Sequence, residues 1–338
     1  MDRFATRLLL VAALALAFSA CGRKTAGAGR VVVAYVTSWS DVMPDPQYMT
    51  HVNYAFGHVD TTFDAVRIDN PDRLRAIAAL KEESPALNVL LSVGGWGSGR
   101  FSEMAGDEAL RKSFCASCAE AVEDFGLDGI DIDWEYPTSD MAGISASPDD
   151  TENFTLLMRD LREALGPDRF LTIATSATAR YIDYKAVVGY LDFVNVMAYD
   201  MSMGTAHHSG LYPSAFSAEL TSDGAVKAHL AAGVPPEKLV MGMPFYGRGS
   251  RRFGGYVDYR DVTEQGYTIC WDEVSQVPFI VDSLRNYVFG FENPRSLAIK
   301  CGYIVEHGLR GGMYWDYAGD NAAHDLARTV ADGLLNTL

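Results

Sequence analysis

Eight short runs of β-branched and apolar residues recur along this chain, and longer segments with helical periodicity separate most of them. The predicted strands are residues 31–36, 52–56, 89–93, 129–135, 171–176, 193–199, 239–245 and 312–315. The predicted helices are residues 71–83, 107–125, 150–165, 215–232, 294–307 and 322–335. Two connections, 37–51 and 177–191, show a less clear pattern. Near-continuous apolar strands flanked by helices indicate a parallel sheet that is covered on both faces.

The number of strand–helix units favours a closed barrel. Eight units in a chain of 338 residues predict an α/β protein with the (β/α)8 TIM-barrel fold, built as a single domain. An open, doubly wound sheet is the alternative, but no glycine-rich phosphate-binding fingerprint follows an early strand. Residues 247–286 separate the seventh strand from the last helix–strand unit. We expect this short insertion to form a loop or a small hairpin on the barrel rim.

Carboxylates occupy the predicted strand 129–135, where the lumen of a barrel is normally apolar. Strand side chains alternate between two faces, so Asp131, Asp133 and Glu135 share the face toward the lumen. Burying carboxylates close together is costly, and their repulsion forces at least one of them to hold a proton near neutral pH. A carboxyl group with a raised pKa can protonate a leaving oxygen, as glycosidases require. The row therefore predicts acid catalysis. A metal cage fits poorly, because no histidine ligands accompany the acids.

The segment from Asp128 to Glu135 matches the D-x-x-D-x-D-x-E signature of glycoside hydrolase family 18, and the chain resembles the chitinases of that family. Ser92, Gly94 and Gly95 resemble the S-x-G-G motif of the family. Other segments that are similar to family motifs contain Tyr35, Phe56, Trp96, Met197, Tyr199, Asp200, Arg248 and Trp315. These segments cover nearly the whole chain after residue 30.

The resemblance implies a retaining hydrolysis of β-1,4-linked N-acetylglucosamine polymers or oligomers, without a protein nucleophile. Glu135 would protonate the glycosidic oxygen, and the acetamido oxygen of the substrate would attack the anomeric carbon to give an oxazolinium. Asp133 would bind the acetamido N–H and stabilise its developing charge, while Asp131 modulates Asp133. Tyr199 would orient the acetamido group. No metal and no organic cofactor is implied.

The resemblance also implies a set of binding and supporting residues. Trp315 would form the floor under the sugar, and Asp200 would contact the sugar or share the charge network. The other binding candidates are Tyr35, Phe56, Trp96, Met197 and Arg248, and the supporting residues are Asp128, Ser92, Gly94 and Gly95. Each of these assignments has a structural alternative, because Tyr199 and Trp315 could be core aromatics and the glycines could serve a tight turn. We assign no role to His207 and His208.

Two other functions stay open at this point. The same family and the same catalytic acid also serve endo-β-N-acetylglucosaminidases that act on N-glycans. Family members without the acid are non-catalytic glycan-binding proteins, and a surface lipoprotein that binds chitin is the corresponding alternative here.

Asp and Glu outnumber Lys and Arg by 44 to 28, so the formal net charge is −16. This balance argues against a nucleic-acid partner and suits a neutral glycan better. We expect a monomer.

The first residues have the pattern of an export signal. Arg3 and Arg7 precede an uncharged apolar run over residues 8–20, which is too short to span a bilayer comfortably. The run ends in small residues and Cys21 follows directly, an arrangement that resembles the lipobox of bacterial lipoproteins. We therefore expect a signal peptide (1–20), a tether anchored through acylated Cys21 (21–30) and a catalytic barrel (31–338), in a lipoprotein exported to the periplasm or the cell surface. An ordinary secreted protein is the alternative.

Four further cysteines are present, Cys115, Cys118, Cys270 and Cys301. A metal site would need further Cys or His residues at ligand spacing, and none lies near Cys115 and Cys118. Buried, unreactive thiols or a disulfide are the two interpretations that remain.

Overall fold

The computed structural model describes residues 29–250, 253–262 and 268–336. The predicted signal peptide, Cys21 and nearly all of the predicted tether lie outside these residues.

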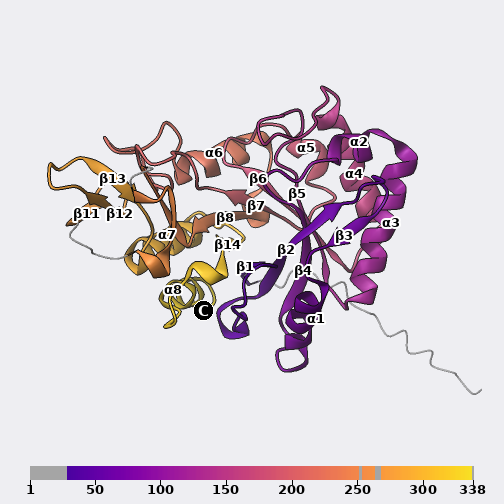
Figure 1. The fold of residues 1–338 in the computed structure, drawn as a ribbon, viewed down its shortest axis with the longest axis horizontal. Coiled ribbons are helices and arrows are strands. Elements are labelled where there is room, and N and C mark those ends of the chain that lie inside the picture. The colour runs from indigo at the N-terminus through magenta and orange to yellow at the C-terminus, as the bar shows by residue number, and fades with distance from the viewer. Residues whose placement is uncertain (1–28, 251–252, 263–267, 337–338) are drawn as a thin grey trace, which may run out of the picture.

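Eight parallel strands close into a barrel, which confirms the predicted fold class (Figure 1). The barrel order is β1–β2–β4–β5–β6–β7–β8–β14, and β1 pairs with both β2 and β14 to close it. These strands are β1 (Val31–Thr37), β2 (His51–Val59), β4 (Asn88–Gly94), β5 (Gly129–Asp133), β6 (Phe170–Ser176), β7 (Phe193–Met197), β8 (Leu239–Pro244) and β14 (Gly311–Trp315). A short strand that the sequence did not predict, β3 (Val66–Ile68), pairs antiparallel with β2.

Three strands end earlier than predicted, β8 by one residue and β5 and β7 by two. Strand β5 ends at Asp133 and β7 ends at Met197, so Glu135 and Tyr199 lie two residues beyond their strands. Both residues are at the carboxyl end of the barrel, where the loops of this fold build active sites.

Helices follow most of the barrel strands. They are α1 (Pro71–Ala79), α2 (Phe101–Gly106), α3 (Glu108–Asp124), α4 (Asp150–Leu165), α5 (Tyr184–Val187), α6 (Ser222–Ala232), α7 (Pro294–Glu306) and α8 (Asp325–Leu334). The predicted helix 215–232 begins seven residues late, because the Thr221 side chain accepts from Gly224 N and caps α6 at that point. The predicted helix 322–335 begins only at Asp325, and α2 was not predicted.

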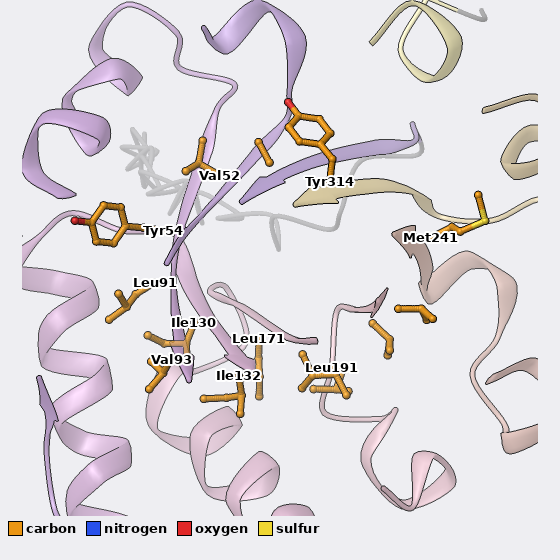
Figure 2. Packing of buried hydrophobic residues seen from close by; sticks show 14 of the residues in the cluster. Val52, Tyr54, Leu91, Val93, Ile130, Ile132, Leu171, Leu191, Met241 and Tyr314 are labelled. Atoms are coloured by element: carbon orange, nitrogen blue, oxygen red, sulfur yellow. The ribbon is translucent and has the colours of Figure 1, made fainter. Parts of the chain in front are cut away.

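Alternate residues of the strands build two separate apolar layers. Val32, Ala34 and Val36 of β1 join a large cluster between the strands and the helices, whereas Val31, Val33 and Tyr35 face the lumen. The outer cluster also contains Ile130, Ile132 and Trp134, the apolar partners of the acidic row, and Figure 2 shows several of its members. The side-chain period of two therefore leaves Asp131 and Asp133 on the inner face.

The segment between β8 and α7 is a small sheet rather than the predicted loop or hairpin. Five antiparallel strands pair in the order β10–β9–β13–β12–β11 and lie to one side of the barrel in Figure 1. They are β9 (Tyr246–Gly249), β10 (Tyr256–Asp258), β11 (Thr268–Asp272), β12 (Val277–Val281) and β13 (Tyr287–Gly290). Aspartates organise two of its turns, since Asp272 accepts from Val274 N and Asp282 accepts from Leu284 N. A small core around Ile280, Phe289 and Phe291 holds the sheet together.

The four cysteines in the described residues are free thiols, and three of them are buried. Burial raises the pKa of Cys115 to about 12, which makes an unreactive structural thiol the better interpretation. No helix within residues 29–250, 253–262 and 268–336 is long and apolar enough to cross a bilayer. The same residues contain no group of three or more His, Cys, Asp or Glu side chains arranged to hold a metal ion.

Candidate active site

Asp131 is the centre of a hydrogen-bond network inside the barrel. Its side chain is 0% exposed, and its Oδ2 atom accepts from Tyr35 Oη and Ser92 Oγ, each at 2.8 Å. Its Oδ1 atom accepts from Thr172 Oγ1 at 2.6 Å and from Asn195 Nδ2 at 3.2 Å. The four donors come from β1, β4, β6 and β7. Burial raises the pKa of Asp131, and the four hydrogen bonds oppose that rise.

Asp133 lies two residues after Asp131, nearer the mouth of the barrel, and one of its carboxylate oxygens is buried without a hydrogen-bond partner among the described residues. Burial, together with the charges of Glu135 and Asp131, holds the pKa of Asp133 well above its ordinary value. Its Oδ1 atom is buried and has no hydrogen-bond partner among the residues that the structure describes. Buried polar atoms are nearly always paired, so an unpaired carboxylate oxygen at a barrel mouth indicates a position that a ligand fills.

Glu135 is suited to hold a proton near neutral pH. Burial raises the pKa of Glu135 to about 7, the charge of Asp200 adds to the rise, and a hydrogen bond with Tyr136 opposes it. Tyr136 is itself stacked on Tyr181, with 5.0 Å between ring centroids. A carboxyl group with a pKa near the working pH is an effective general acid.

Asp200, by contrast, is held as an anion. It accepts from Arg248 Nε and Tyr246 Oη, both at 2.7 Å, and lies 3.5 Å from His208 Nδ1. Burial raises the pKa of Asp200, but Arg248 and His208 outweigh burial and hold that pKa well below its ordinary value. The Arg248 guanidinium also lies over the ring of Tyr256, 5.1 Å from its centroid. Asp200 thus links β7 to the small antiparallel sheet.

Aromatic rings line one side of the mouth. Trp315 stacks on Phe56 with 5.7 Å between centroids and lies 5.7 Å from Tyr35. Trp39, which is 66% exposed, extends this surface and lies 6.4 Å from Trp315. Trp96 is 61% exposed at the end of β4. Such faces suit the apolar side of a pyranose ring.

The two glycines at the end of β4 are required by close contacts. A Cβ atom on residue 94 would lie 2.0 Å from the carbonyl oxygen of Asp133, and a Cβ atom on residue 95 would lie 2.6 Å from the ring of Phe56. Both glycines also have positive φ, at 131° and 92°. They allow β4 to approach Asp133 and Phe56 together.

The remaining predicted residues occupy separate places. Tyr199 is buried beside Tyr246, and its hydroxyl lies 3.8 Å from Met313 Sδ. Met197 is half-buried against the luminal cluster. Asp128 lies at the opposite end of β5 from Glu135, where it accepts from Lys81 Nζ at 2.7 Å and from Val89 N at 2.9 Å. It anchors the strand and does not belong to the mouth.

The sequence did not single out Thr172, Asn195 or Tyr246, and we assigned no role to His208, which lies beside Asp200. A signal was present for the first two, because Asn195 is the only polar residue of β7 and Thr172 interrupts the apolar first half of β6. The period of two from Phe170 and Phe193, which face the lumen, places Thr172 and Asn195 there as well. The contact of Tyr246 with Asp200 had no such signal, since it depends on how β9 leaves the barrel.

The family model for glycosyl hydrolases family 18 matches residues 31–320. The chain belongs to glycoside hydrolase family 18. It is a chitinase-like glycoside hydrolase, and its four signature acids occupy β5 and the two ends of that strand.

Individual relatives agree with this family. Chitinase A1 of Niallia circulans is 32% identical in an alignment of 316 positions that covers 78% of this chain and 45% of that protein. The chain therefore spans less than half of that relative. Chitotriosidase-1 of Mus musculus is 30% identical over 91% of this chain and 79% of that protein. The solved structure of a family 18 N-acetylglucosaminidase from Paenibacillus barengoltzii is 36% identical, with a TM-score of 0.82 over 90% of this chain and 100% of that one.

Proposed function

We propose that this family 18 enzyme hydrolyses β-1,4-linked N-acetylglucosamine chains with retention of configuration, using the acetamido group of the substrate as nucleophile. The observation that carries the proposal is the unpaired, buried Oδ1 atom of Asp133, two residues before a Glu135 whose pKa is raised to about 7. The first group is suited to accept from an acetamido N–H, and the second is suited to donate a proton to a leaving oxygen.

In the first step, the bond between the anomeric carbon and the glycosidic oxygen breaks, and its electron pair goes to that oxygen together with the Glu135 proton. The acetamido carbonyl oxygen forms a new bond to the anomeric carbon, which gives an oxazolinium ion. In the second step, water attacks the anomeric carbon from the face that the leaving group vacated. Glu135 takes a proton from that water, and the oxazolinium opens.

The neighbouring carboxylates divide two further tasks. Asp133, charged or sharing a proton with Glu135, would bind the acetamido N–H and stabilise the positive charge of the ring. Asp131 would hold Asp133 in place from below through its own fixed network. Tyr199, buried beside the lumen, would orient the acetamido oxygen toward the anomeric carbon.

A protein nucleophile is the competing route, and Asp200 would be its nearest candidate. Its carboxylate, however, already accepts from Arg248 and Tyr246, and its pKa is held low. A carboxylate that two donors engage is a weak nucleophile. We therefore infer that Asp200 supplies negative charge and positions the site, whereas Trp315 and Phe56 support the sugar ring.

The test compares the wild-type enzyme with Glu135→Gln on chitin oligomers and on N-glycoproteins, side by side. We expect β-anomeric products from chitin oligomers, measured by NMR before mutarotation, and a loss of at least about a thousandfold in kcat for the variant. Circular dichroism should show that the variant is folded. α-Anomeric products would exclude the mechanism, and release of glycans from N-glycoproteins without cleavage of chitin oligomers would reassign the substrate.

A further inference from the structure

A groove with a volume of about 560 Å³ adjoins the site on the side of β1, β10 and β14. Trp39 and Trp315 line it as aromatic faces, and Asp41, Asp258, Asp316 and Arg260 are the charged side chains that line it among the described residues. Trp315 belongs both to this groove and to the aromatic wall of the site. The groove is therefore continuous with the position of the sugar that is cleaved.

The place of the groove in the barrel tells which part of a glycan would reach it. In the closed strand order, β14 lies on the side of the barrel opposite β5, which carries the acidic row. If the reacting sugar lies on Trp315 with its anomeric carbon toward Glu135, its other end points away from Glu135 and into the groove. The groove thus receives the next sugar units toward the non-reducing end.

The charges in this groove are only partly compensated. Burial raises the pKa of Asp316 to about 6, and the charge of Asp258 adds to that rise. Burial likewise raises the pKa of Asp258, which Arg260 opposes from 3.0 Å. Arg260 also approaches Asp261 at 3.7 Å and is 43% exposed at its side chain. Within the groove lining, the single guanidinium of Arg260 accompanies three carboxylates, Asp41, Asp258 and Asp316.

Two buried polar groups beside these charges have bonding capacity left. Thr37 is 1% exposed, and its hydroxyl has no hydrogen-bond partner among the residues that the structure describes. Asp316 is 9% exposed, and its Oδ1 atom accepts from Gly319 N, which caps a short helical turn. A ligand that brings several donors and a positive charge would satisfy the hydroxyl and use the lone pairs of Asp316 that the backbone N–H groups of Gly319 and Ala318 leave open.

We propose that this groove selects a glucosamine unit with a protonated amine, so that the substrate class is partially deacetylated chitin. The inference rests on the proposed function, because it places this unit next to the N-acetylglucosamine that reacts. An ammonium group brings three donors and a positive charge and reduces the repulsion between Asp258 and Asp316. An acetamido group at the same position would desolvate these carboxylates without a compensating charge.

The experiment uses two tetrasaccharides that differ at one position. One is fully acetylated, and the other has glucosamine next to the reacting N-acetylglucosamine, on its non-reducing side. We expect the wild-type enzyme to cleave the second with a kcat/KM about tenfold higher at low salt, which is the size of one charge-assisted hydrogen bond. The ratio should fall as salt is added.

Asp316→Asn tests the groove itself, because asparagine keeps the oxygen that accepts from Gly319 N. Its ratio of the two kcat/KM values should fall to about one, and Asp258→Asn should lower the ratio in the same direction. Glu237→Gln, an exposed site outside the groove, removes the same charge and should leave the ratio unchanged. A wild-type ratio at or below one, or a ratio that Asp316→Asn leaves unaltered, would refute this inference alone. Failure to cleave either tetrasaccharide would refute the proposed function.

Discussion

Tyr35 donates a 2.8 Å hydrogen bond to Asp131 across the lumen, from β1 to β5. These strands are not neighbours in the barrel order, so only closure of the barrel brings the two side chains together. The same carboxylate also accepts from three further strands. Donors from four strands therefore hold the Asp131 carboxylate in one position. Asp133 and Glu135 follow it on the same face of the chain.

Tyr35→Phe removes one of the four donors and leaves the buried carboxylate less well compensated. We expect a loss of about 2 kcal/mol in the free energy of unfolding, the usual cost for a hydrogen bond to a charged group. Urea denaturation measures it. Tyr54→Phe is a matched control, since this equally buried phenol donates only to the backbone oxygens of Asp69 and Asn70. The control should lose about 1 kcal/mol in the free energy of unfolding and keep full kcat. An equal loss of stability in both variants would contradict the idea that the hydrogen bond to the Asp131 carboxylate contributes more than one to backbone oxygens.

The pH profile reports the proton on Glu135. Since a general acid must be protonated, kcat/KM should fall as the pH rises through about 7. The charge of Asp200 raises this pKa, so Asp200→Asn should move the alkaline limb to lower pH. The hydrogen bond with Tyr136 lowers it, so Tyr136→Phe should move the same limb to higher pH. The measurement is the pH profile of kcat/KM on a chitin oligomer for the wild type and both variants. If both variants shifted the alkaline limb in the same direction, a group other than Glu135 would set that limb.

Asp133→Asn should stabilise the protein while it damages catalysis. The folded-state pKa of Asp133 lies above its unfolded value, so the wild-type fold loses stability as the pH rises from the unfolded pKa toward the folded one. The variant has no such loss, and its advantage should grow from little at pH 4 to on the order of 2 kcal/mol at pH 8. Thermal unfolding at both pH values measures this difference.

Asp128→Asn, directly before the same strand, provides the opposite case. Lys81 pairs with that carboxylate at 2.7 Å, so its replacement should destabilise the protein at pH 8. If both asparagine variants changed stability in the same direction, burial without a partner would not be the cause of the Asp133 effect.

Gly94→Ala should prevent correct folding of the site, because its Cβ would lie 2.0 Å from the Asp133 carbonyl oxygen. We expect a loss of more than about 4 kcal/mol, or insoluble protein. Gly97→Ala is the control, because Gly97 also has a positive φ, of 81°, but its nearest neighbour would be 3.8 Å away. It should cost only about 1 kcal/mol, measured by urea denaturation. Similar losses would mean that φ alone, and not the contact with Asp133, requires glycine at position 94.

Cys21 lies outside the described residues, and its lipidation stays a prediction from the sequence. In a bacterial host with lipoprotein processing, the wild-type protein should fractionate with membranes and incorporate labelled fatty acid. Cys21→Ser should do neither and should appear in the soluble exported fraction. Release of the wild-type protein from membranes by high salt alone would indicate charge attraction instead of an anchor.

The sequence by itself determined the barrel fold and the face of the strand from which Asp131 and Asp133 point into the lumen. The period of two and the eight apolar runs are local properties, and they place Asp131 and Asp133 inward as soon as Ile130 and Ile132 face the helices. The glycines of the S-x-G-G motif were likewise visible. The close approaches to Asp133 and Phe56 that require them were not, because those contacts lie between separate strands.

Only the tertiary structure decided which groups surround those acids. Thr172 and Asn195 meet Asp131 through barrel closure, and Arg248 meets Asp200 because β9 follows β8 directly and pairs in a second sheet. That sheet was expected to be a loop or a small hairpin, since its strands are only three to five residues long and become strands by pairing with one another. Hydrogen-bond partners and pKa values depend on distances between residues far apart in the chain. Burial and register set those distances, and neither is a property of any single segment.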